Sequence, residues 1–170
     1  MATLNVSDLN RQGKVFVAAN AAAGNFIAVA ATQTNLNLYN PLGSGVKLVL
    51  IEVGFSWTTV PGAVHNLGLA TFTNLSALPT GITQIGVAAD GSNNIPKGQA
   101  TASIVLSAAP TARRWFGGAA WGSSVSVNPG IIVDRVDGSI VLVPGSSVSI
   151  VGLTTTAVGV GSFVWAELPV

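Results

Sequence analysis

The residue types that do nucleophilic and metal chemistry are almost absent from this chain. It has no cysteine and one histidine, His65, so a serine nucleophile would have to use that single base. No Gly-x-Ser-x-Gly elbow precedes a helical pattern. Zinc needs several histidine or cysteine ligands, which the sequence cannot supply. We therefore expect His65 to be a hydrogen-bonded or interface residue, and we predict no metal and no cofactor.

Paired carboxylates are the remaining catalytic possibility. Glu52 and Glu167 lie in segments that are otherwise apolar. Glycosidases need only two carboxyl groups, so these two could serve as acid and base if both faced one cleft. The alternative is that each lies at a strand edge or a subunit seam, paired with a lysine or arginine of a neighbour. We favour the second interpretation and predict no catalytic residue and no enzyme.

A cluster of arginines and aromatic residues is the best candidate interaction site. Arg113, Arg114, Trp115 and Phe116 are consecutive, and Trp121 follows them in a glycine-rich segment. Arginine and tryptophan are enriched at interface hot spots, and Trp121 could also stack on a sugar. In the alternative, the three aromatic rings plug one end of the fold while the arginines stay in solvent. We interpret residues 110–122 as a loop.

The composition points to a subunit rather than to a free-standing protein. Only 8% of the 170 residues are charged, where an average soluble domain has about 25%. The 7 basic and 6 acidic residues give a net charge of +1, so we predict no nucleic-acid partner. Long stretches, such as 55–89 and 138–166, carry no charge. We expect copies of the chain to cover one another as a homo-oligomer.

The mean hydropathy of +0.60 raises the question of a membrane protein. The uncharged stretch 138–166 has the length of a span, but Pro144 and several glycines and threonines interrupt it. The first residues, 1–8, lack the basic and apolar regions of a signal peptide. We therefore predict no membrane partner.

Alternation of apolar and polar residues, with glycine and proline between the runs, predicts eight to ten strands. The candidate strands are 15–17, 26–29, 34–39, 46–59, 65–73, 81–88, 100–107, 139–143, 147–153 and 163–168, and 131–134 is a short apolar run. The alanine-rich stretch 15–31 also suits a helix, but we favour the two strands there. This spacing predicts one all-β domain over residues 15–170, an antiparallel β-sandwich, with the jelly roll as the favoured topology. In the longest strand, we expect Lys47, Val49, Ile51, Val53, Phe55 and Trp57 to share one face.

The polar start of the chain, residues 1–14, is predicted to be an extended N-terminal arm, or a first short turn, rather than part of the core. Its three charged residues, Asp8, Arg11 and Lys14, are the candidate arm contacts.

Three segments carry a resemblance to a known group of proteins: NPLGSGVKLVL at 40–50, VPGSSVSI at 143–150 and FVWAE at 163–167. Together they resemble the jelly-roll decoration or cement proteins, and related accessory proteins, of tailed bacteriophages. The resemblance implies a non-enzymatic virion structural protein, most simply a capsid decoration protein that stabilises the phage head. It implies dimers or trimers seated on the major capsid protein or another virion protein, in particles assembled in the host cytoplasm.

A second hypothesis comes from a different class of function. A glycan- or receptor-binding sandwich domain of a phage tail or a bacterial surface protein would use Trp57, Trp115 or Trp121 as stacking platforms.

Overall fold

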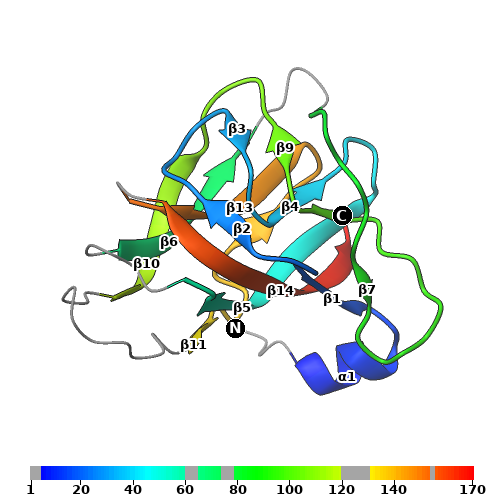
Figure 1. Ribbon diagram of the computed structural model, residues 1–170. Helices are drawn as coiled ribbons and strands as arrows, with labels where there is room; N and C mark the ends of the chain where they lie inside the picture. Colours follow the sequence, from blue (N-terminus) through cyan, green and yellow to red (C-terminus); the bar gives the residue numbers. More distant parts are fainter. Residues whose placement is uncertain (1–4, 60–64, 74–78, 120–130, 154–155) are drawn as a thin grey trace.

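The computed structural model describes residues 5–59, 65–73, 79–119, 131–153 and 156–170 (Figure 1). One helix precedes the strands, and no helix within these ranges is long and apolar enough to cross a membrane. The elements are α1 (Val6–Arg11), β1 (Val15–Ala19), β2 (Gly24–Phe26), β3 (Thr32–Gln33), β4 (Asn37–Asn40), β5 (Val46–Trp57), β6 (His65–Phe72), β7 (Val87–Ala88), β8 (Gln99–Thr101), β9 (Ile104–Val105), β10 (Thr111–Ala119), β11 (Ile131–Arg135), β12 (Val141–Leu142), β13 (Ser146–Gly152) and β14 (Ala157–Pro169).

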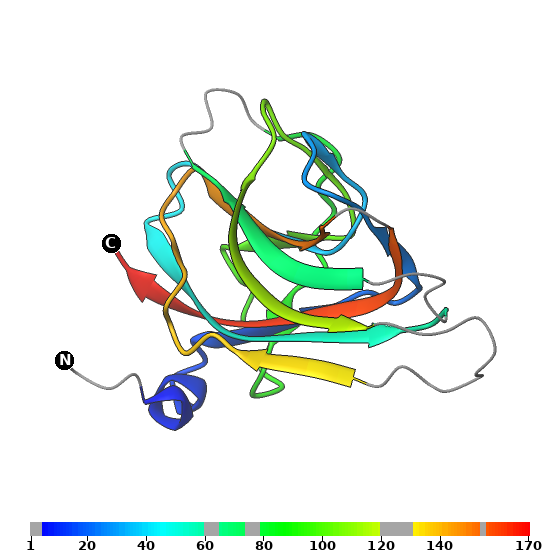
Figure 2. The ribbon, with the colours of Figure 1, turned by 90° about the vertical axis from the view of Figure 1, so that its left-hand side faces the viewer.

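Two antiparallel sheets pack face to face, which confirms the predicted antiparallel β-sandwich (Figure 2). Sheet A has the order β11-β5-β14-β1-β7, with β12 also paired to β5 and β2 also paired to β14. Sheet B has the order β10-β6-β13-β4-β8. A third, two-stranded sheet consists of β3 and β9.

The main strand pairs are nested in the sequence, so that each pair encloses the next. β1 pairs with β14, β4 with β13, β5 with β11, and β6 with β10. Two further ladders, β5 with β14 and β6 with β13, join these pairs side by side. As a result β10 and β11, close to the middle of the nest, lie at the edges of sheets B and A respectively.

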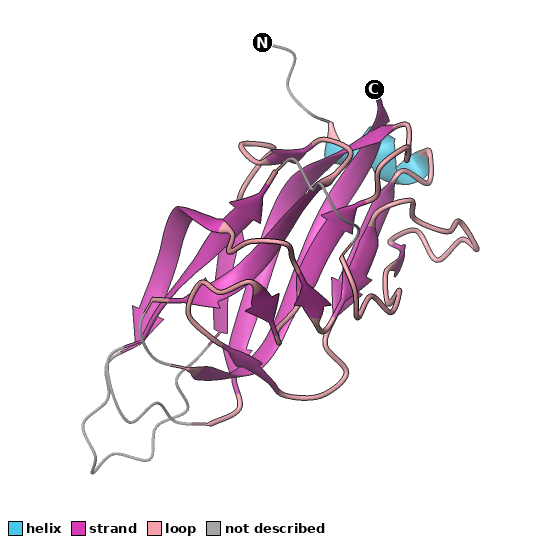
Figure 3. Cartoon of the chain, turned by 90° about the horizontal axis from the view of Figure 1, so that it is seen from above, coloured by secondary structure: helices cyan, strands magenta, loops and turns pink. Residues whose placement is uncertain are grey.

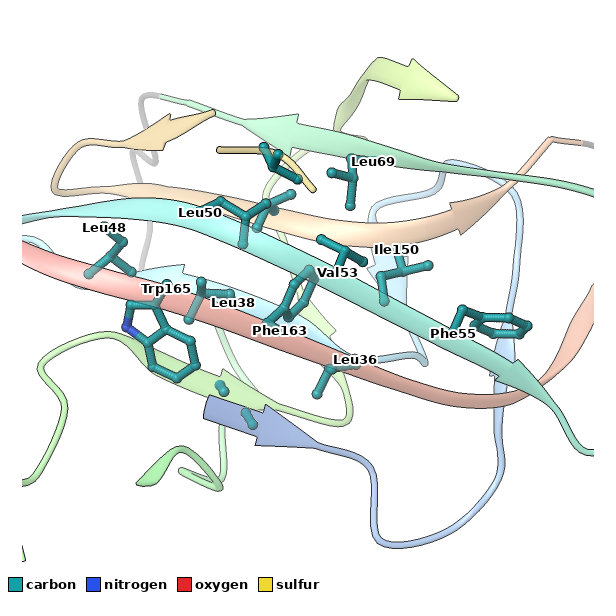
Figure 4. Packing of buried hydrophobic residues seen from close by; sticks show 14 of the residues in the cluster. Leu36, Leu38, Leu48, Leu50, Val53, Phe55, Leu69, Ile150, Phe163 and Trp165 are labelled. Atoms are coloured by element: carbon teal, nitrogen blue, oxygen red, sulfur yellow. The ribbon is translucent and has the colours of Figure 1, made fainter. Parts of the chain in front are cut away.

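The core fills the space between the two sheets (Figure 4). Phe55 lies edge-on to Phe26 and to Trp57, with ring centroids 4.8 and 4.9 Å apart. Trp165 stacks on Phe16 at 5.9 Å. Such aromatic pairs stabilise a core beyond the area they bury.

The predicted face of the longest strand is wrong over half its length, because β5 contains a bulge. Its ladder with β14 shifts between Val164 and Trp165, which pair with Glu52 and Leu50 and leave Ile51 as the extra residue. A bulge shifts the alternation of side chains by one position. The core-facing residues of β5 are therefore Val46, Leu48, Leu50, Val53, Phe55 and Trp57.

The bulge places Val49 and Ile51 on the outer face of sheet A, where helix α1 covers them. In this second cluster Val6 and Leu9 of the helix pack against Val49, Ile51 and Ala166. Val15, the first residue of β1, belongs to the same cluster. The predicted extended arm is thus wrong over α1, which lies below sheet A in Figures 1 and 2. The side chain of Asn5 caps the helix by accepting a hydrogen bond from the backbone N–H of Asp8 at 3.2 Å.

The long connection from β6 to β10 wraps around both sheets. It contributes β7 to the edge of sheet A, β8 to the edge of sheet B, and β9 to the small third sheet. Ile104 and Leu106 of this connection pack against Tyr39 on the outer face of sheet B. Apolar residues on the outer faces of β4 and β5 are therefore covered within the chain, and their burial requires no second copy.

Three predicted strands are shorter than expected. The strand predicted over 81–88 is reduced to β7, the one over 100–107 is divided into β8 and β9, and the one over 139–143 is reduced to β12. All three lie at sheet edges or in the wrapping connection, where a single ladder leaves the ends of a strand free to bend.

Candidate functional site

The predicted loop over 110–122 is wrong from Thr111 to Ala119, which form the edge strand β10. This strand pairs with β6 but shifts register twice, between Ala112 and Arg114 and between Trp115 and Gly117. Two bulges within nine residues remove the alternation on which strand prediction relies. The first bulge also turns Arg113 and Arg114 toward one cavity, where a regular strand would point them to opposite faces.

The cavity, which we name the arginine pocket, lies where β10 of sheet B approaches β12 of sheet A. Its volume is about 570 Å³. It is lined by Thr71, Thr73, Arg113, Arg114, Ser139, Ile140, Val141, Leu142 and Ser146. Its walls therefore combine two guanidinium groups, four hydroxyl groups and an apolar floor.

The two arginines have different partners. Arg114 Nη2 lies 2.8 Å from Asp134 Oδ1, so this ion pair links the edge strands of the two sheets. Arg113 Nε donates to Thr71 Oγ1 at 2.7 Å. Within the described ranges no carboxylate lies within ion-pair distance of Arg113, so this pocket-lining guanidinium group has no counter-charge there.

The aromatic residues of the cluster separate. Phe116 is partly buried and packs against the core, as the plug interpretation expects. Trp115 instead covers Gly68 on the outer face of sheet B, where a Cβ atom at Gly68 would lie 2.6 Å from Trp115 Cε3. Its side chain remains 43% exposed, so it does not plug the sandwich. Trp121 lies outside the described residues.

The candidate arm contacts do not line this pocket; they lie on α1, the helix in Figure 3, and just after it. Asp8 and Arg11 form an exposed ion pair with each other at 3.7 Å, a geometry that contributes little to stability. The carbonyl oxygen of Lys14 accepts a hydrogen bond from the backbone N–H of Glu167, where the chain enters β1.

Glu52 and Glu167 do not share a cleft. Residues directly opposite in an antiparallel ladder present their side chains to the same face. Glu52 is opposite Val164, which packs under helix α1, whereas Glu167 is opposite Leu48, which lies in the core. The two carboxylates therefore lie on opposite faces of sheet A, and the acid–base pair considered from the sequence does not form.

Glu167 instead anchors the wrapping connection. Its oxygens accept hydrogen bonds from the backbone N–H groups of Lys97 at 3.0 Å and Gly98 at 2.7 Å, and from Trp165 Nε1 at 3.3 Å. The carboxylate is buried, so water cannot replace these bonds. Backbone and indole N–H groups therefore hold the Glu167 side chain, and not the lysine or arginine that we expected from the sequence.

We expect Glu167→Gln to lower the free energy of unfolding by about 1–3 kcal/mol, because an amide must turn one N–H₂ donor toward backbone donors. Urea unfolding followed by tryptophan fluorescence measures the loss. Glu52→Gln, on the half-exposed outer face, is the matched control and should change stability by less than about 0.5 kcal/mol. Equal losses in the two variants would contradict the anchoring role.

His65 begins β6 and is buried, opposite Ala119 of β10. Burial lowers the pKa of this imidazole below its usual value of 6.5. No group of three histidine or acidic side chains within the described ranges is placed to hold a metal ion.

The lowered pKa of His65 makes stability depend on pH in a defined direction. The unfolded chain binds the proton more readily, so stability is full above pH 6.5 and declines as the pH falls through and below that value. We expect the free energy of unfolding to decrease as the pH is lowered from about 7.5 to about 5.5, the range in which an ordinary imidazole titrates. Since His65 is the only histidine, His65→Gln should flatten this slope, and an unchanged slope would refute the assignment.

Comparisons with family models, with curated proteins and with solved structures found no match to this chain.

Proposed function

We propose that this chain is a non-enzymatic structural subunit that works as an oligomer. The observation that carries the proposal is an uncovered part of the outer face of sheet A, beyond the end of helix α1. We name it the open face; it consists of Ala19, Glu52, Gly54, Ser56, Ile131, Val133, Val160 and Ser162. Ile131 and Val133, on the edge strand β11, are 74% and 55% exposed.

The shape and residue types of the open face suit contact with another protein surface. Gly54, Ser56 and Ser162 leave a shallow hollow of about 210 Å³ beside the two exposed β-branched residues. Glu52 and Arg135 are opposite each other in the ladder at one end of the face. An apolar centre with charges at its margin is the usual arrangement of a protein interface.

We propose further that the sandwich is a jelly roll. That topology has eight strands and two Greek keys, and it serves both viral capsid proteins and lectins. Four nested strand pairs support this topology: β1–β14, β4–β13, β5–β11 and β6–β10. The β5–β14 and β6–β13 ladders join these pairs side by side.

Within this class, we propose that the subunit is a virion protein, a decoration or cement protein of a phage head. Support comes from the sequence resemblance, the nested pairing and the low charge of the chain. Binding to the assembled shell and not to its separate components would stabilise the shell by mass action. Apolar seams with few charges would keep the cost of desolvation low.

The test of the virion assignment is co-purification with intact particles. We expect the protein to band with particles in a density gradient at a fixed copy number that reflects the lattice. Its absence from purified particles of the phage that encodes it would overturn this assignment, while leaving self-association to be judged separately.

A second candidate function is glycan or receptor binding, favoured by the half-exposed ring of Trp115 on the same strand as the arginine pocket. Aromatic rings exposed on a rigid strand provide stacking surfaces for sugars. A glycan array tests it, with Trp115→Ala applied to any hit. Hits that this substitution abolishes would support the second function, and an array without hits would count against it.

A further inference from the structure

We propose that the arginine pocket binds a carboxylate-bearing sugar, with Arg113 as the residue that holds the carboxylate. This inference stands apart from the assembly proposal, because the pocket and the open face are different surfaces. The arginine pocket has a volume of about 570 Å³, which falls within the range of about 300–1,000 Å³ usual for small-molecule sites.

The charge of the pocket calls for an anion. Arg114 is neutralised by Asp134, whereas Arg113 has no acidic partner among the residues described, and none of the lining residues is acidic. The pocket thus keeps one positive charge from Arg113. A guanidinium group binds a carboxylate through two parallel N–H···O bonds, which gives both strength and orientation.

One hydrogen bond restrains Arg113, an exposed residue, before any ligand arrives. Its Nε is already occupied by Thr71 Oγ1 at 2.7 Å, so the Nη groups are the donors left for a ligand. The bulge between Ala112 and Arg114 supplies the backbone turn that aims the side chain into the pocket. A donor held in place in this way loses less conformational entropy when the ligand binds.

The rest of the lining favours a sugar body over a bare inorganic anion. The hydroxyl groups of Thr73 and Ser139 provide donors and acceptors beside the arginine. Ile140 and Leu142 form an apolar floor on which the C–H face of a pyranose ring can rest. A small anion such as sulfate would leave this floor and these hydroxyl groups unused.

Isothermal titration calorimetry on the full chain tests the inference with glucuronate, galacturonate and N-acetylneuraminate as probes. The methyl ester of each acid removes the ligand's charge and keeps its ring. We expect at least one acid to bind and its ester to bind at least about tenfold more weakly. Inorganic sulfate is the second control, and binding as tight as that of the acids would overturn recognition of the sugar.

Two substitutions locate the site. Arg113→Gln should weaken binding of the acid by at least about tenfold, and Arg113→Lys by less, because lysine keeps the charge but not the paired donors. Arg135→Gln removes the same charge from an exposed position on the outer face and should leave affinity unchanged. Thermal unfolding checks that each variant is folded.

Three further results would refute the inference. The first is no binding of any of the three acids at tens of millimolar. The second is an affinity that Arg113→Gln leaves unchanged. The third is equal binding of acid and ester. None of them bears on self-association, which is measured independently by sedimentation.

Discussion

Trp165→Ala is expected to lower the free energy of unfolding by about 3–5 kcal/mol, the cost of removing a large aromatic side chain from a packed core. Trp165 is fully buried and stacks on Phe16. The edge of its ring also fills the space beside Gly86, where a Cβ atom would lie 2.7 Å from Cη2. The substitution therefore removes contacts to β1 and to the wrapping connection together (Figure 4).

Trp115→Ala is the matched control, since it makes the same substitution at a ring that is 43% exposed. We expect a loss of about 1 kcal/mol or less, because the ring covers Gly68 but leaves the core intact. Urea unfolding followed by circular dichroism compares the two variants without relying on tryptophan fluorescence. Equal losses would contradict the assignment of Trp165 to the core and Trp115 to the surface.

The second large effect is expected at the open face. Ile131→Lys combined with Val133→Glu keeps the net charge of the chain and places two charges where the proposed interface is apolar. Burying unpaired charges is costly, so we expect self-association to weaken by about 100-fold or more. Sedimentation velocity across a concentration series measures the change.

The matched control for this pair is Val87→Lys combined with Ile95→Glu. These residues are exposed to 58% and 83% and lie outside the open face, on β7 and in the wrapping connection. We expect the control variant to associate like the parent chain. Equal weakening by both pairs would show that surface charge in general, rather than the open face, controls association.

Strand content and the sandwich could be predicted from local pattern, and the exceptions have a common cause. The alternation of β5 and β10 is interrupted by bulges at Ile51 and near Arg113. A bulge is fixed by ladder geometry across strands that are distant in sequence, and the local pattern of residues does not encode it. For the same reason, β10 was predicted to be a loop and the faces of β5 were predicted incorrectly.

Helix α1 shows a second limit of local pattern. Its apolar residues Val6 and Leu9 are too few to indicate an amphipathic helix, and the helix is six residues long. Short helices gain most of their stability from tertiary packing. The partner surface, Val49 and Ile51, faces outward only because of the bulge in β5.

The two arginines of the candidate site could be predicted from the sequence, but the rest of the pocket could not. The residue types of Arg113 and Arg114 mark them as contact residues, and the structure places both on one pocket. Thr71, Ser139 and Ser146, which complete that pocket, come from two other parts of the chain, residues 71–73 and 139–146. Only the nested pairing of strands brings them together, and no spacing in the sequence indicates it.

Sedimentation equilibrium of the purified chain over micromolar concentrations tests whether the chain assembles with itself through neutral sheet surfaces. We predict a mass that is a fixed multiple, two or three times the 17.1 kDa of the chain. The variant with Ile131→Lys and Val133→Glu should sediment at the mass of one chain. A parent protein that stays strictly monomeric throughout that range would rule out self-assembly as its mode of action.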